Sequence, residues 1–264
     1  MWGLCTKIRL FPYLLLHLQI STSFALSNTD HSISKEHNRQ RINHSNRFQG
    51  SMTSKLSNMT HYARRIQHAL TGILFYLLSF VISTKLASSL LVIATLAFYI
   101  LLHLGRAKSK RIQDMYLQWF GSLLREHEKQ LHQLPGAFWF LLGTTIVVLC
   151  FDMQVARISI LCLSLGDPIA ALVGIRFGGY YQNGLIPPNK SIHGCVSCFI
   201  VCFCICITHI SIDCFRNAIG ISIVTALVAT IMECYGKHCM SLDDNLLISL
   251  GVATTLHMFD YDSI

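Results

Sequence analysis

Apolar segments of helical length recur along most of this chain of 264 residues. They cover about residues 66–83, 86–104, 136–151, 155–175, 192–212, 217–232 and 245–259. Such a segment crosses a bilayer as a helix, because a helix satisfies all of its own backbone hydrogen bonds. Hydrophobic residues make up 52% of the chain and charged residues only 13%, which is too little polar surface for a soluble globule. The sequence therefore predicts an all-α polytopic membrane bundle of about seven transmembrane helices.

The amino-terminal region has a different composition. Residues 1–26 place basic residues ahead of a short apolar core, as in a signal peptide or signal anchor. Residues 27–60 are basic and rich in Ser, Asn and His, so we expect a disordered segment that could act as a transit peptide. This arrangement resembles the bipartite presequence of algae with complex plastids, with Phe24 near the cleavage site; an ordinary signal anchor with a basic tail is the alternative. Residues 61–264 are expected to form the membrane domain.

The basic residues are distributed unequally between the two faces of the predicted bundle. One face collects most of the lysines and arginines of the loops, so the positive-inside rule places it in the cytosol, or in the stroma of a plastid. The same face gathers most polar groups that could take part in chemistry, namely Arg64, Arg65, His68, Asn189, Lys190, Glu233, Asp243, Asp244 and Asn245.

Asp167 lies in the middle of the apolar run "LCLSLGDPIAALVG", residues 161–174. An ionisable side chain within a membrane span is costly and is expected to face a polar cavity and to have a function. Pro168 follows it, and an Asp-Pro pair is typical of an N-cap followed by the first helical residue. The sequence therefore predicts a helix that is broken at Asp167-Pro168 and lines a site.

A ribbon of small residues accompanies this aspartate. Gly166, Ala170, Gly174 and Gly178 recur at every fourth position, which lets another helix or a ligand approach the backbone closely. Arg176 follows in "GIRFGGYYQNG" and is placed to meet an anion.

The segment "NKSIHG" is a candidate phosphate site. Asn189 and Lys190 come just before the fifth apolar segment, and Ser191 is a candidate N-cap. A lysine beside the free N–H groups of a helix N-terminus can bind phosphate, although such a lysine can also be an interfacial anchor.

The segment "ECYGKHCMSLDDNLL" supplies three carboxylates and an amide. Hard oxygen ligands at this density suit Mg²⁺ or Ca²⁺. The alternative is an acidic loop that caps a helix beginning near Asn245. With the buried aspartate included, the candidate metal ligands are Asp167, Glu233, Asp243, Asp244 and Asn245.

Five of the eleven cysteines crowd into "CVSCFIVCFCIC", at Cys195, Cys198, Cys202, Cys204 and Cys206. They lie on several faces of one apolar helix and have no neighbouring partner cluster, whereas a zinc site needs converging thiolates. We therefore interpret them as small residues that suit packing and lipid.

"ARRIQHALTG" completes the set of candidate residues. Arg64 and Arg65 can bind phosphate, and His68, one turn later, can act as a base or a hydrogen-bonding group. Phosphate-binding cations, oxygen ligands and a buried carboxylate on one membrane face indicate phosphoryl transfer to a lipid alcohol. A small ion or solute transporter, or a structural membrane protein, is the rival hypothesis.

Five blocks in order, "ARRIQHALTG", "LPGAFWFLLG", "LGDPIAALVGIRFG", "NKSIHG" and "LDDNLLISLG", resemble the CTP-dependent lipid kinase family of diacylglycerol, phytol, farnesol and dolichol kinases. That family is in turn similar to phosphatidate cytidylyltransferases. The resemblance implies CTP as phosphate donor, a divalent cation and a hydrophobic alcohol as acceptor. The functional residues of its diacylglycerol kinase branch fall on Arg64, Arg65, Asp167 and Gly174. Arg65 stands where that family commonly has lysine, and Pro168 and Ile175 also depart from its pattern.

The acceptor that the resemblance favours is diacylglycerol, giving phosphatidate, in the endoplasmic reticulum or nuclear envelope. The amphipathic approach to the third span, in residues 115–143, is more like the diacylglycerol kinase branch. A plastid presequence would instead favour phytol or another prenol in a plastid membrane, and dolichol is a further alternative. The lipid bilayer is an expected partner and nucleic acid is not.

Overall fold

The computed structural model describes residues 62–121, 123–131, 133–177, 187, 190–210, 215–240 and 242–259. All regular structure within these ranges is helical, which confirms the all-α prediction for this part of the chain. The chain forms two compact units, one with Leu101–Gln133 and the residues up to Gln67, the other with His68–Ile100 and the residues from Leu134 onward. The predicted signal, residues 1–26, and the basic segment, residues 27–60, lie outside the described residues.

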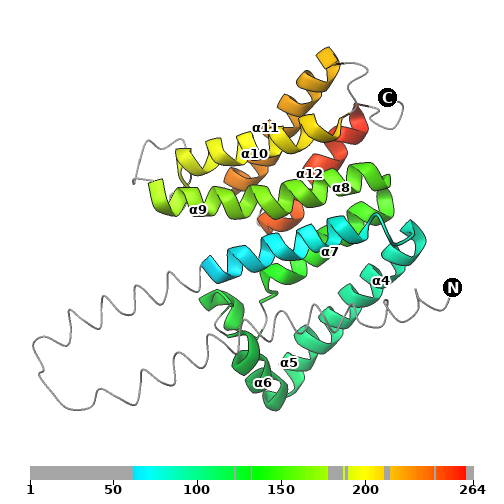
Figure 1. Ribbon diagram of the computed structural model, residues 1–264. Helices are drawn as coiled ribbons and strands as arrows, with labels where there is room; N and C mark the ends of the chain where they lie inside the picture. Colours follow the sequence, from blue (N-terminus) through cyan, green and yellow to red (C-terminus); the bar gives the residue numbers. More distant parts are fainter. Residues whose placement is uncertain are drawn as a thin grey trace, which may run out of the picture. The chain divides into compact units, whose positions relative to one another are not determined.

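The second unit is a bundle of long apolar helices. It contains residues 68–78 of a helix that begins at residue 62, α4 (Thr84–Ala97), α7 (Gly136–Cys150), α8 (Met153–Leu161), the π-helical segment η3 (Cys162–Gly166), α9 (Asp167–Phe177), α10 (Ile192–His209), α11 (Phe215–Met240) and α12 (Asp244–Met258) (Figure 1). α8, η3 and α9 follow one another without a break, and α10 runs beside them. In the apolar part of this long helix 61% of the residues are buried, so it is the central helix of the unit.

Each apolar segment of the sequence corresponds to a helix, but not every helix is long enough to cross a bilayer. Within the described residues four helices are long and apolar enough: Thr84–Lys108, Met153–Phe177, Ile192–His209 and Ala218–Tyr235. α7 is apolar but shorter, with 15 residues. The chain is therefore a membrane protein with four candidate spans, and the predicted count of about seven is not confirmed.

The predicted break at Asp167-Pro168 is wrong. Asp167 has helical dihedral angles, φ −63° and ψ −48°, so it continues the helix and does not cap a new one. Proline lacks the N–H that an α-helix needs at this position, and its ring crowds the preceding turn. The wider π-helical turn of Cys162–Gly166 lies directly before this point, and such a turn accommodates both problems without breaking the helix.

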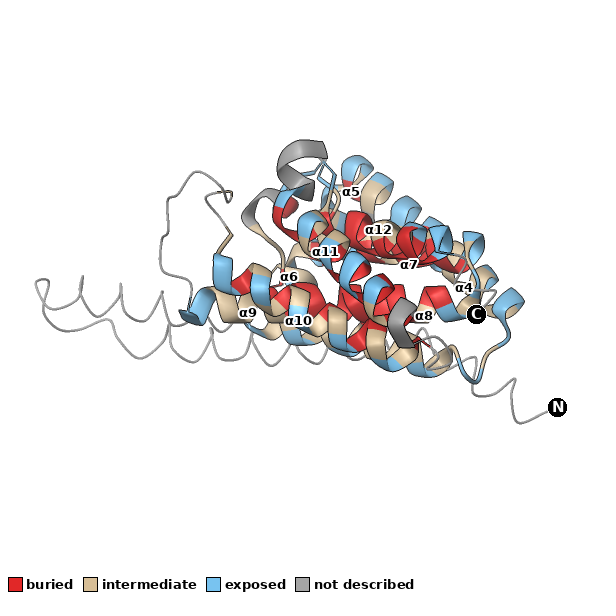
Figure 2. Cartoon of the chain, turned by 90° about the horizontal axis from the view of Figure 1, so that it is seen from above, coloured by how far each residue is buried: buried red, intermediate tan, exposed pale blue. Residues whose placement is uncertain are grey.

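The core of the second unit lies between its central helix, α7 and α12. Buried residues follow the facing sides of α7, α8 and α12 (Figure 2). At one end of the unit Arg157 of α8 donates from Nε to Ser79 Oγ and from Nη2 to Ser79 O, both at 2.8 Å, and its guanidinium stacks on Phe80. Gly72 contacts Ser164 farther along. Residues 68–78 are therefore antiparallel to the central helix, with His68 on the Asp167 side.

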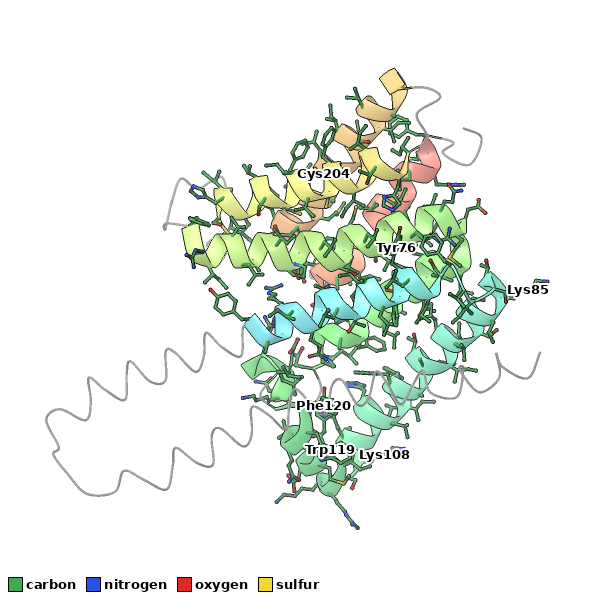
Figure 3. The ribbon with its side chains drawn as sticks, viewed as in Figure 1. Tyr76, Lys85, Lys108, Trp119, Phe120 and Cys204 are labelled. Atoms are coloured by element: carbon green, nitrogen blue, oxygen red, sulfur yellow. A yellow bond between two sulfur atoms is a disulfide. The ribbon has the colours of Figure 1, made fainter. Side chains whose placement is uncertain are left out.

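The first unit contains α5 (Gly105–Lys108), α6 (Lys110–Phe120) and the 3₁₀ helix η2 (Glu126–Lys129). Arg106 is buried at its centre and donates to Gln113 Oε1 at 2.6 Å and to the carbonyl oxygens of Glu128 and Gln130. Its guanidinium also lies 4.3 Å from the centre of the Tyr116 ring. Figure 3 shows the outward side chains of this unit, among them Lys108 and Trp119.

Candidate functional site

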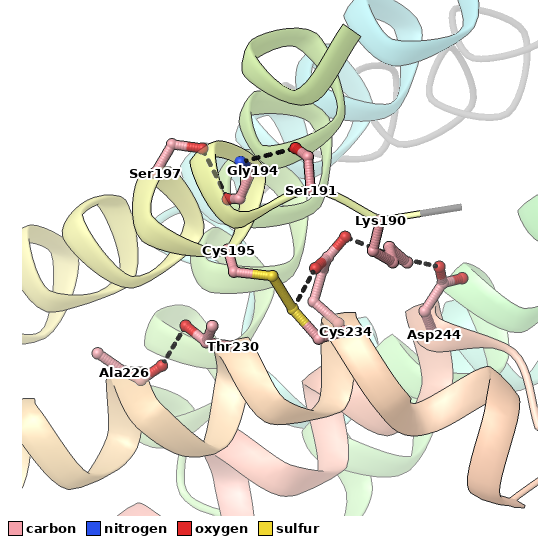
Figure 4. The surroundings of a disulfide bond; sticks show 10 residues. Lys190, Ser191, Gly194, Cys195, Ser197, Ala226, Thr230, Cys234 and Asp244 are labelled. Carbon is pink, nitrogen blue, oxygen red and sulfur yellow. Dashed lines mark hydrogen bonds and ion pairs between the residues drawn. A yellow bond between two sulfur atoms is a disulfide. The ribbon is translucent and has the colours of Figure 1, made fainter. Parts of the chain in front are cut away.

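Lys190 lies between two acidic side chains that come from different helices. Its Nζ donates to Glu233 Oε1 on α11 at 2.6 Å and lies 3.5 Å from Asp244 Oδ2, at the start of α12 (Figure 4). The side chains of Glu233 and Asp244 are only 4% and 7% exposed, and that of Lys190 is 22% exposed. The fold therefore brings Lys190 of the "NKSIHG" segment together with Glu233 and Asp244 of the "ECYGKHCMSLDDNLL" segment.

The pKa of Lys190 reflects this environment. Burial by itself lowers the pKa, because it disfavours the charged amine. The negative charges of Glu233, Asp244 and Asp167 act in the opposite direction and outweigh it, so the pKa of Lys190 lies above its ordinary value of 10.5. Lys190 is therefore a permanent cation at neutral pH, and Asp167 is near enough for its charge to act on it.

Asp167 is the first residue of α9 and is buried, as is Pro168 beside it. It directly follows the π-helical segment, a feature that occurs frequently at functional sites. A buried carboxylate in an apolar helix would be very unfavourable without polar surroundings. The positive charge of Lys190 provides part of such surroundings, whereas Glu233 carries the same negative charge and opposes the ionised form of Asp167.

The N-terminus of α10 packs closely against α9. Ser191 is the N-cap, as predicted, and its Oγ accepts a hydrogen bond from Gly194 N at 3.1 Å. A Cβ atom on Gly194 would lie 2.7 Å from the carbonyl oxygen of Ala170, and one on Gly174 would lie 2.9 Å from Ser191 Oγ. α10 is therefore the helix that packs closely against the small residues of α9. Gly178, the last of these small residues in the sequence, lies outside the described residues.

Two of the candidate metal ligands take part in helix capping and packing. Asp243 is the N-cap of α12, and its Oδ1 accepts from Asn245 N at 3.1 Å. Asn245 in turn donates from Nδ2 to the carbonyl oxygen of Gly136 at 3.2 Å, which joins α12 to the start of α7. Asp244, which lies between Asp243 and Asn245 in the chain, contacts Lys190.

The remaining candidates are distributed as follows. His68 packs edge-on against Phe140, with ring centroids 4.7 Å apart. Arg176 is exposed near the end of α9, and its guanidinium lies 5.8 Å from the centre of the Phe177 ring. Arg64 and Arg65 belong to the first unit, whose position relative to this cluster is not determined. Asn189 lies outside the described residues.

The interpretation of Cys195 as a packing residue is wrong. Cys195 of α10 forms a disulfide with Cys234 of α11, and their Cα atoms are 6.6 Å apart. Cys234 directly follows Glu233, and its Sγ lies 3.3 Å from Glu233 Oε2. One sequence signal could have indicated this disulfide. Cys195 follows Lys190 by five positions and Cys234 directly follows Glu233, and Lys190 and Glu233 are both among the residues predicted to lie on the same face of the bundle.

The other cysteines of the "CVSCFIVCFCIC" segment agree with the packing interpretation. Cys198, Cys202 and Cys206 are fully buried along one side of α10, and Cys202 Sγ lies 3.9 Å from the carbonyl oxygen of Cys162. Cys204 is exposed on the same helix. Thiols in the interior of this bundle thus act as small apolar side chains.

Comparison with known proteins gives three informative relatives. An uncharacterized protein of Rickettsia prowazekii is 29% identical over 201 residues, 75% of this chain and 94% of that protein. CTP-dependent diacylglycerol kinase 1 of Eremothecium gossypii is 32% identical over 102 residues, 39% of this chain and 31% of the kinase. Probable phytol kinase 1, chloroplastic, of Oryza sativa is 28% identical over 144 residues, 49% of this chain and 44% of that protein.

The chain thus matches less than half the length of each of these two kinases. No family model matches the sequence, and no solved structure matches it. These two kinases bear names that agree with the family that the five sequence blocks resemble. The chain is therefore a relative of the CTP-dependent lipid kinases.

Proposed function

We propose that this protein is an integral membrane lipid kinase that transfers the γ-phosphate of CTP to the hydroxyl of a hydrophobic alcohol. The observation that carries the proposal is the position of Lys190 between Glu233 and Asp244, within the field of Asp167. Lys190 lies just before α10, Asp244 begins α12 and Glu233 is near the end of the apolar part of α11, so a water-soluble nucleotide and a lipid hydroxyl can reach the same place.

The residues of this cluster fit a hard divalent cation, Mg²⁺ or Ca²⁺. Three carboxylates surround a single ammonium, so the cluster in its ionised form keeps an excess of negative charge that a divalent cation would neutralise. Asp167, Glu233 and Asp244 are the ligands we propose, with Asp243 and Asn245 next to them in the chain. When bound, the cation would neutralise charge on the phosphate oxygens.

The cations of the chain would hold the phosphates. Lys190 supplies a permanent positive charge two residues before α10, and the first turn of that helix, with Ser191 and Gly194, adds the partial positive charge of its N–H groups. We assign a further phosphate contact to Arg176, while the roles proposed for Asn189, Arg64 and Arg65 rest on the sequence alone. Lys190 would shift from its carboxylate partners toward phosphate when phosphate binds, because both attract the same ammonium.

Proton transfer completes the reaction. The acceptor hydroxyl must lose its proton as its oxygen attacks phosphorus, and a carboxylate or a histidine within hydrogen-bonding distance can take that proton. Asp167 and His68 are the proposed groups, since the contacts of Gly72 with Ser164 and of Ser79 with Arg157 place both residues toward the same end of the second unit. Gly174 lets the start of α10 pack closely against α9 beside this region, because a larger residue there would meet Ser191 Oγ.

The proposed acceptor is diacylglycerol, with phosphatidate as the product and the endoplasmic reticulum or nuclear envelope as the location. Support comes from the name of the fungal relative and from the amphipathic α6 ahead of the third apolar segment. The rice relative, which is named a chloroplastic phytol kinase, supports phytol and a plastid membrane as the second candidate.

Membranes that contain the protein provide the test. They would be incubated with CTP labelled in the γ-phosphate, with either cation, and with diacylglycerol, phytol or dolichol in parallel. We expect label in phosphatidate, and a loss of about a thousandfold or more in an Asp167→Asn variant that still folds. If label appears only in phytol, phytol replaces diacylglycerol as the proposed acceptor. If folded protein labels none of the three lipids, the kinase proposal is refuted.

A further inference from the structure

The disulfide contacts the same carboxylate that binds Lys190. Glu233 directs Oε1 to Lys190 Nζ at 2.6 Å, while its Oε2 lies 3.3 Å from Cys234 Sγ (Figure 4). Cys234 adjoins Glu233 in α11, and Cys195 lies in the first turn of α10. A chemical change at the sulfur atoms therefore occurs next to the proposed kinase site.

The bond also constrains the two helices that carry the ion pair. Lys190 precedes α10 by two residues and Glu233 belongs to α11, so the Cys195–Cys234 bond ties the helices together beside the contact between them. With the bond in place the helices resist separation here, and Lys190 remains close to Glu233. In the proposed reaction, however, Lys190 shifts from this carboxylate toward phosphate.

We propose that Cys195 and Cys234 form a redox modification site that controls the exchange of Lys190 between Glu233 and phosphate. The inference rests on the proposed function. In the disulfide form the ion pair is held closed and the enzyme is slow. In the dithiol form the helices can separate locally, and a Cys234 thiol can donate a hydrogen bond to Glu233 Oε2, which weakens the hold of this carboxylate on Lys190.

The predicted orientation of the chain places Cys195 and Cys234 where their oxidation state can change. The loop charges predict that the face bearing Lys190 lies in the cytosol or the stroma. Disulfides in reducing compartments are usually transient, and many of them sense redox conditions. The dithiol is then the resting form, and the disulfide forms when the compartment becomes oxidising.

The chemistry is thiol–disulfide exchange with a small dithiol or disulfide as co-reactant. Cys195 is partly exposed and Cys234 is buried, so Cys195 is the sulfur that an external thiolate can attack. The attack breaks the Cys195–Cys234 bond, and Cys234 leaves as a thiolate that takes up one proton. The second thiol of the reductant then releases Cys195, so the protein gains two electrons and two protons and the reductant becomes a disulfide.

The full-length protein in lipid nanodiscs would be equilibrated with reduced or oxidised dithiothreitol and alkylated with N-ethylmaleimide. Peptide mass mapping would then measure the linked peptide that contains both cysteines. In the same samples a water-soluble acylating reagent would report the reactivity of the Lys190 amine, and labelled CTP with a lipid alcohol would report phosphoryl transfer. The variants are Cys195→Ser, Cys234→Ser and, as the matched control, Cys204→Ser, since Cys204 is exposed and unbridged on the same helix (Figure 3).

We expect reduction to raise both the reactivity of Lys190 and the kinase rate about tenfold, which corresponds to about 1.4 kcal/mol. The Cys195→Ser and Cys234→Ser variants should show the reduced values under both conditions, and Cys204→Ser should switch like the wild type. The inference is overturned if the linked peptide does not form, or if Lys190 reacts equally in both states. A redox-dependent Lys190 reactivity without phosphoryl transfer to any lipid would support the switch and count against the proposed function.

Discussion

Replacement of Lys190 by methionine tests the energetic role of the charged cluster. The substitution keeps most of the aliphatic volume but removes the ammonium that contacts Glu233 and Asp244. Both carboxylates are almost completely buried, and loss of one partner from a buried ion pair usually destabilises a protein by about 3–5 kcal/mol. Lys190 is 22% exposed, so water can enter and the lower end of this range, about 3 kcal/mol, is expected.

This loss of stability should lower the midpoint of thermal unfolding of the second unit. For a domain of 150–250 residues, 1 kcal/mol corresponds to about 2–4 °C, so Lys190→Met should lower the midpoint by about 6–12 °C. The midpoint can be followed by circular dichroism in detergent or nanodiscs. Lys85→Met, which removes an exposed lysine on α4, is the matched control and should change the midpoint by about 1 °C or less.

A double variant separates the loss of the ion pair from a simple packing defect. In Lys190→Met with Glu233→Gln, no unpaired carboxylate remains at position 233, so the double variant should be more stable than Lys190→Met alone. Additive destabilisation by the two substitutions would refute the claim that they interact. The raised pKa of Lys190 also sets a pH dependence. The contribution of its charge is complete below the ordinary value of 10.5 and is lost as pH rises through the higher folded value.

Three further outcomes are expected. Gly194→Ala should destabilise the second unit by about 1–3 kcal/mol, because the added Cβ would meet the Ala170 carbonyl. A Cβ added at Gly220 has no neighbour within 4 Å, so Gly220→Ala should not change stability, and thermal unfolding would distinguish the two variants. Ser191→Ala should cost about 1 kcal/mol by the same measurement, since α10 loses its N-cap bond, and Ser191→Asn should restore it. Burial raises the pKa of Tyr116 from 10.0 to about 12, so stability should fall as pH rises from 10 to 12, by up to about 3 kcal/mol. Tyr116→Phe should abolish this fall in pH-dependent unfolding.

Much of this fold was predicted by patterns that involve residues close to one another in the sequence. Apolar segments correspond to helices because a helix in lipid satisfies its own backbone groups, whatever surrounds it. The N-cap at Ser191 and the close helix contact at Gly174 also follow from local sequence, because capping and small size act over one or two turns.

Other features depend on the whole structure. Local preference predicted a break at Pro168, but the π-helical turn before it accommodates the proline, and the central position of this helix favours a continuous rod. The disulfide joins residues that are 39 positions apart, and the contact of Lys190 with Glu233 spans 43 positions. Only the packing of α10 against α11 brings them together, and sequence periodicity carries no information on that pairing.

The π-helical segment determines which way the residues after it point. A π-helical turn is equivalent to one additional residue in an α-helix, and one residue rotates everything that follows by about 100°. Removing a single residue from Cys162–Gly166 would therefore turn the α9 portion of the rod about its own axis and carry Asp167 and Gly174 away from α10 together. The number of residues in this one turn therefore determines which side of α9 faces the interior of the unit. Any chain with the same helix arrangement must keep that number.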